Sequence, residues 1–192
     1  FTGVMEEILS NNTHITMVSH QSNSKMQKLQ GELNQYILEL TGKERKTFHI
    51  PVIINKGKKL TFETTQRSRS FLYATLGAVI AKMFGLRKVK FYENGITSCN
   101  LSFDGQGLQA RSTRSTHPKV LNNLSELVST VFNEDFMFEN PFFTKTKTDV
   151  IERLKELQQQ AKIELTRSCA KSIFRGNLTH SGLCSQCIER RF

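Results

Sequence analysis

The chain has 192 residues, of which 38% are hydrophobic and 23% charged; this suits a globular domain with its own core and excludes disorder over most of its length. No apolar run approaches the roughly 18 residues of a membrane-spanning helix, because the longest, Phe71 to Phe84, contains Lys82, so we expect a soluble, cytoplasmic protein. The 27 Lys and Arg exceed the 17 Asp and Glu, which gives a net charge of +10. This charge favours anionic partners such as nucleotide phosphates or RNA; the alternative is that the basic residues form a solvated surface.

Amphipathic segments alternate along the chain with short runs rich in β-branched residues. Helices are predicted over residues 1–10, 25–40, 69–84, 119–132 and 148–157, and strands over residues 15–19, 48–54, 88–92 and 136–138. Gly42 and Gly85 end the second and third helices, and Pro118 suits the first turn of the fourth. Strands separated by helices predict an α/β fold, a three-layer sandwich whose mostly parallel sheet is covered by helices on both faces.

The pattern changes near residue 166, after which a polar segment rich in cysteine follows. We therefore expect one α/β domain over residues 1–165 and a small tail over residues 166–192 that packs on the same domain. Because Phe1 already belongs to an amphipathic helical segment, we also expect no signal peptide and a longer protein upstream.

Three of the four cysteines lie in this tail. Cys184 and Cys187 form a C-x-x-C turn, which presents two thiolates to one ion, and Cys169 with His180 completes four ligands in the pattern C-x10-H-x3-C-x2-C. Zinc is the predicted ion. The alternatives are a redox C-x-x-C, buried free thiols, and an exposed His180 that binds nothing. Cys99 lies apart, in an expected loop, and is predicted to be a small buried residue.

Short motifs spread over nearly the whole chain carry a family resemblance. They are His20-Gln21 after the first strand, Arg69-Ser70 at the start of the third helix, Asn140-Pro141 before Thr146-Lys147-Thr148-Asp149, and Cys169 before Cys184-Ser185-Gln186-Cys187. Together they resemble 7-cyano-7-deazaguanine synthase and its relatives in the N-type ATP pyrophosphatase (PP-loop) superfamily, whose fold is that of the adenine-nucleotide alpha-hydrolases.

The sequence departs from this family in three places. The phosphate-binding loop Ser-Gly-Gly-x-Asp-Ser is missing, and the resemblance implies that the chain begins just after it and is inactive alone. Ser181 stands where the family has a fourth zinc cysteine. Residues 110–118, rich in Arg and ending in Thr-His-Pro, replace the family's Tyr-Pro-Asp-Cys-Arg and are closer to the synthase-like proteins of antiphage defence.

The resemblance implies an ATP- and magnesium-dependent ligase that adenylates a carboxylate such as 7-carboxy-7-deazaguanine. Ammonia or a protein or peptide amine then displaces AMP, and a homodimer is one expected assembly. Lys147 is the expected catalytic cation, and the alternative is a surface charge at a helix start. His117 is a candidate general base, and the alternative is a histidine with a structural hydrogen bond.

Candidate ligand contacts come from several segments. Arg111 and Arg114 suit an acidic substrate, unless they are plain surface charges. Glu93 and Asn94 follow a strand, where open α/β sheets bind ligands, unless Asn94-Gly95 is only a turn. The remaining contacts that we expect with ATP or substrate are His20, Gln21 and Arg69.

Two other functions remain open. A PP-loop enzyme of the tRNA-thiolation type would use the net positive charge for RNA contacts. A non-catalytic zinc module would bind nucleic acid or a partner protein through Arg190 and Arg191.

Overall fold

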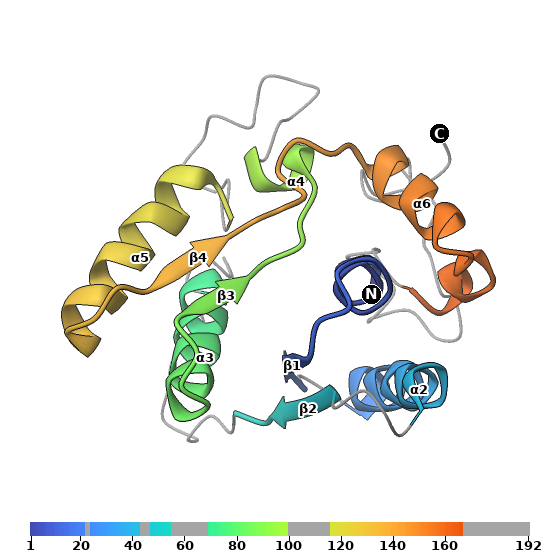
Figure 1. The fold of residues 1–192 in the computed structure, drawn as a ribbon, viewed down its shortest axis with the longest axis horizontal. Helices are drawn as coiled ribbons and strands as arrows, with labels where there is room; N and C mark the ends of the chain where they lie inside the picture. The colour runs from blue at the N-terminus through green and yellow to red at the C-terminus, as the bar shows by residue number, and fades with distance from the viewer. Residues whose placement is uncertain (22–23, 43–46, 55–68, 100–115, 167–192) are drawn as a thin grey trace. The chain divides into compact units, whose positions relative to one another are not determined.

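The computed structural model describes residues 1–21, 24–42, 47–54, 69–99 and 116–166 (Figure 1). They divide into two compact units. The first unit comprises the described parts of Phe1–Met17, Gln21–Ile50 and Thr146–Phe192, and the second those of Val18–His20 and Pro51–Lys145.

Helices from both ends of the described chain build the first unit. Its elements are α1 (Thr2–Met5), the π-helical turn η1 (Glu6–Ser10), α2 (Ser24–Thr41), α6 (Lys147–Glu156) and the 3-10 turn η3 (Gln160–Leu165). Two further strands, β1 (Ile15–His20) and β2 (Thr47–Val52), pair in a two-stranded sheet, and the division between the units falls within each of them. Burial lowers the pKa of His49 on β2, because an imidazolium loses hydration there.

The core of the first unit joins residues that are distant in sequence. Met5, Ile8, Ile37 and Leu154 are buried together there. At its edge, Arg153 on α6 forms a bidentate pair with Glu6, with nitrogen–oxygen distances of 2.6 and 3.0 Å. These charge-assisted bonds therefore connect α6 with η1.

The second unit is a βα structure around a parallel strand pair. It contains α3 (Arg69–Met83), β3 (Lys88–Lys90), α4 (Gly95–Cys99), α5 (Pro118–Phe132) and β4 (Met137–Glu139). β3 and β4 run parallel, and Val89 is in register with Phe138. A Cβ atom at Gly77 of α3 would lie 3.2 Å from the Val89 side chain, so the glycine allows a close approach of helix and strand.

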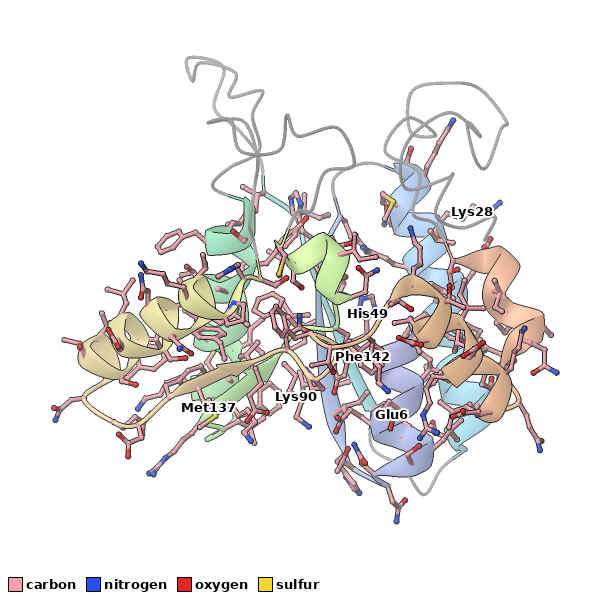
Figure 2. The ribbon with its side chains drawn as sticks, turned by 90° about the horizontal axis from the view of Figure 1, so that it is seen from above. Glu6, Lys28, His49, Lys90, Met137 and Phe142 are labelled. Carbon is pink, nitrogen blue, oxygen red and sulfur yellow. The ribbon has the colours of Figure 1, made fainter. Side chains whose placement is uncertain are left out.

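One face of the β3–β4 pair carries the core of the second unit. The buried residues are Ala74, Ala78, Ala81, Leu121, Leu124, Phe136 and Phe138, supplied by α3, α5, β4 and the residue before β4. The other face carries the exposed side chains of Lys88, Lys90 and Met137, of which Figure 2 labels the last two. Lys88 forms an ion pair of 2.9 Å there with Glu139. Within this unit, α3 and α5 thus cover one face of the strand pair.

The predicted elements are all present close to their expected bounds, and the α/β class with a parallel strand pair is confirmed. The short helix α4 was not expected. It places Cys99 at a helix end rather than in a loop. No helix in the described ranges combines the length and the apolar character that crossing a membrane requires.

Candidate functional site

The carboxyl ends of β3 and β4 meet at one edge of the strand pair, and polar residues follow both strands. Glu93 and Asn94 come after β3, and Asn140 comes after β4. The backbone pairing continues past the strands, because the Phe91 amide donates to the Glu139 carbonyl at 2.8 Å. In open α/β sheets this edge is where ligands bind.

Asn140 joins the two turns at this edge. Its Oδ1 accepts from the backbone amides of Glu93 and Phe142, at 3.3 and 3.2 Å. Its Nδ2 donates to the Glu93 carbonyl at 2.8 Å and to Ser98 Oγ at 2.9 Å. Both backbone polar groups of Glu93 are therefore bound to one side chain, which fixes this residue relative to β4.

Asn94 starts α4 from the same turn. Its Oδ1 accepts from the Thr97 amide at 2.8 Å, the usual bond of a helix N-cap. Gly95 follows, and its amide donates to the Lys145 carbonyl at 2.9 Å. Phe142, labelled in Figure 2, contacts Tyr92 edge to face, with ring centroids 5.1 Å apart.

A buried pair of hydroxyl groups connects this edge with the start of α5. Ser98 is fully buried and Thr116 is 2% exposed, and their hydroxyl oxygens lie 2.9 Å apart. Thr116 donates to Glu93 Oε2 at 2.6 Å. Glu93 itself is half-buried.

His117 has a structural role as the N-cap of α5. Its Nδ1 accepts from the Lys119 amide at 3.2 Å. A neutral histidine whose Nδ1 accepts a hydrogen bond carries its proton on Nε2. In this arrangement the ring offers a donor at Nε2 rather than the lone pair of a general base.

The other predicted residues lie at element ends. His20, the last residue of β1, contacts the ring of Tyr73 on α3, with centroids 6.1 Å apart, and the half-buried Gln21 follows it. Arg69 is the first residue of α3. Lys147, half-buried, is the first residue of α6 in the first unit.

A capping box begins α6 in front of this lysine. The Thr146 hydroxyl accepts from the Asp149 amide at 3.1 Å, and the Asp149 carboxylate accepts from the Thr146 amide at 2.7 Å. The Thr-Lys-x-acid motif therefore has a local structural explanation, in which Thr146 and Asp149 hold the helix start and Lys147 stands between them.

The predicted zinc ligands and two predicted substrate contacts fall outside the described residues. They are Cys169, His180, Cys184, Cys187, Arg111 and Arg114. In the part of the chain that the structure describes, no three His, Cys, Asp or Glu side chains gather in a way that would hold a metal ion.

Sequence reasoning found Glu93 and Asn94 at this edge but assigned no role to Ser98, Thr116 or Asn140. The position of Asn140 directly after a strand was a usable signal, since it is the same signal that identified Glu93. No local pattern predicts the Ser98–Thr116 contact or the Thr116–Glu93 contact, because they join residues 18 and 23 positions apart in sequence.

Comparison with known proteins does not assign the chain to a family. No protein-family model matches it, and no curated protein is significantly similar to it.

Proposed function

We propose that the protein is a 7-cyano-7-deazaguanine synthase-like enzyme that activates a carboxylate by adenylation and joins it to nitrogen. The observation that supports this proposal is a polar cluster at the carboxyl ends of the parallel strands β3 and β4. Its members are Glu93, Ser98, Thr116 and Asn140. Such an edge is the usual ligand site of α/β enzymes. The sequence motifs that resemble the synthase family indicate the class of reaction. The proposed architecture is the three-layer sandwich of the same family.

In the proposed reaction, a carboxylate oxygen of 7-carboxy-7-deazaguanine attacks the α-phosphorus of ATP and pyrophosphate leaves. The nitrogen of ammonia or of a protein or peptide amine then attacks the acyl carbon, the bond to AMP breaks, and the nitrogen loses a proton. Lys147 is proposed to stabilise phosphate charge, because a cation that faces a developing anion in a dry site lowers the barrier.

The cysteine tail is proposed to hold a structural zinc ion through Cys169, His180, Cys184 and Cys187. These donors match the thiolate and imidazole ligands that zinc prefers in tetrahedral sites. The element content of the purified protein tests this directly. Wild type should contain about one zinc ion per chain by mass spectrometry, and the Cys184→Ser variant should contain much less. An equal zinc content in both proteins contradicts this ligand set.

Turnover tests the function itself. The phosphate-binding loop is expected upstream of Phe1, so the assay uses the protein with that segment, ATP, magnesium and 7-carboxy-7-deazaguanine, with and without ammonia. Release of AMP and pyrophosphate that depends on the deazapurine is the expected result. A protein that releases neither product, but binds tRNA with a strong salt dependence, would instead favour the RNA-directed alternative, which the net charge of +10 suits.

A further inference from the structure

We propose that α5 carries an autoinhibitory contact, made by Ser125 and Ser129, that closes the outer edge of β4 to strand pairing. The outer edge is the one that faces away from β3. Without the two hydroxyl groups, the same edge becomes a docking site for β4 of a second copy of this chain. The inference is independent of the proposed enzymatic function, because it concerns only contacts within the second unit.

The backbone groups of β4 point alternately to its two edges. At the inner edge, the Met137 amide donates to the Arg87 carbonyl at 2.9 Å, next to β3. Phe136, directly before β4, and Phe138 therefore present their backbone groups at the outer edge. An edge with such groups is a template for pairing with another strand.

Two serines of α5 occupy this outer edge. Ser129 Oγ accepts from the Phe136 amide at 2.9 Å and donates to the Phe136 carbonyl at 3.2 Å. Ser125 Oγ accepts from the Phe138 amide at 3.0 Å and donates to the Leu121 carbonyl at 2.9 Å, within α5. Each hydroxyl group thus uses its one hydrogen on a carbonyl and its oxygen on an amide of this edge.

The repeat of the helix matches the repeat of the strand. Residues four apart in an α-helix lie on one face, about 6 Å apart along its axis. Residues two apart in a strand are about 6.6 Å apart and present their backbone groups at the same edge. Ser125 binds Phe138, and Ser129 binds Phe136. The helix therefore runs antiparallel to β4 (Figure 1) and takes the place of an antiparallel strand.

Loss of the two hydroxyl groups would leave the amides of this edge without their acceptors. Phe136 and Phe138 are each 4% exposed, and a backbone amide in such surroundings needs a partner. A strand that displaces this part of α5 supplies carbonyl groups at the required repeat. β4 of a second copy fits, because two identical edges related by a two-fold axis pair antiparallel and each carries donors and acceptors.

Site-resolved hydrogen exchange of the full chain tests the contact. Ser129→Ala should speed exchange of the Phe136 amide by about 10-fold or more, because this amide loses its acceptor. Ser125→Ala should do the same for the Phe138 amide. Each variant should change its own amide more than the other one, which separates a lost contact from general unfolding.

Thr130→Ala provides the matched control on the same helix. The Thr130 hydroxyl donates to the Glu126 carbonyl at 2.8 Å at an exposed position, which is the same bond to the preceding turn that Ser125 makes. Its removal should leave the exchange of both edge amides as in wild type. If Thr130→Ala speeds them as much as the serine variants do, or if the serine variants leave them protected, the serine hydroxyls do not hold this edge.

Sedimentation velocity at rising protein concentration tests the docking site. The double variant Ser125→Ala/Ser129→Ala should reach about twice the mass of wild type. Its two edge amides should regain protection over the same concentrations, whereas Thr130→Ala should sediment like wild type. A folded double variant that gains no mass and exchanges both amides rapidly at every concentration overturns docking at this edge. The two single variants are measured in the same way, and they decide the question if the double variant does not fold.

Discussion

Gly95 lies where the turn after β4 passes closest to the start of α4. A Cβ atom at this position would lie 2.1 Å from the Phe143 carbonyl oxygen, far inside van der Waals contact. The neighbouring atom is backbone, and it cannot move away as the end of a flexible side chain would. At the residue scale, this glycine allows the turns after β3 and β4 to approach each other and so to form the polar cluster.

The Gly95→Ala variant should accordingly lose about 2–3 kcal/mol of unfolding free energy, in the range of overpacked positions. Urea denaturation followed by circular dichroism measures the loss. Gly31 provides the control, because it lies inside α2 and a Cβ atom there would meet nothing within 4 Å. Gly31→Ala should stabilise the protein by about 0.5–1 kcal/mol through helix propensity. Equal midpoints for the Gly95→Ala variant and wild type would refute the close approach.

At the scale of elements, side-chain caps define several boundaries. His117 and Pro118 begin α5, and Asn133 ends it in the left-handed conformation with φ of 52°. Thr146 and Asp149 begin α6 through their reciprocal capping bonds. These features are local in sequence, so the chain specifies these helix ends without help from distant residues.

Removing one cap should destabilise α6 by a predictable amount. Thr146→Ala leaves the Asp149 amide without its side-chain acceptor and should cost about 1 kcal/mol in unfolding free energy. Thr146→Ser keeps the hydroxyl and should lie within a few tenths of wild type. The comparison is made by chemical denaturation of the three proteins. A Thr146→Ser variant as unstable as Thr146→Ala would show that the methyl group, and not the cap, is responsible.

The same distinction between local and distant signals explains what could be predicted from the sequence. Gly42 and Gly85 were expected to end helices, and both adopt positive φ, 56° and 69°. The helix α4 was missed because one turn has no periodicity, and its Gly95 amide bonds to Lys145, far along the chain. The position of Glu93 near the carboxyl ends of the parallel strands followed from its place directly after a predicted strand, whereas its donor Thr116 could be found only from tertiary structure.

At the scale of the whole molecule, the described residues form two separate hydrophobic cores. Leu154 belongs to the core of the first unit, together with Met5 and Ile37, so that unit needs residues from both ends of the described sequence. Leu121 belongs to the core of the second unit, which the intervening segment builds almost alone. Among the described residues, no buried residue belongs to both cores. A substitution that destabilises one core should therefore affect mainly its own unit.

Hydrogen exchange can separate the two units with a matched pair of cavity variants. Leu154→Ala and Leu121→Ala remove the same atoms from sites that are 3% and 4% exposed, and each should cost about 2–5 kcal/mol in its own core. Leu154→Ala should speed amide exchange in η1 and α2, and Leu121→Ala should speed it in α3 and β4, each with little change in the other unit. If both variants accelerate exchange equally in both units, the two cores unfold as one cooperative structure. The polar cluster then depends on the core that contains Leu154 as strongly as on the core of the second unit.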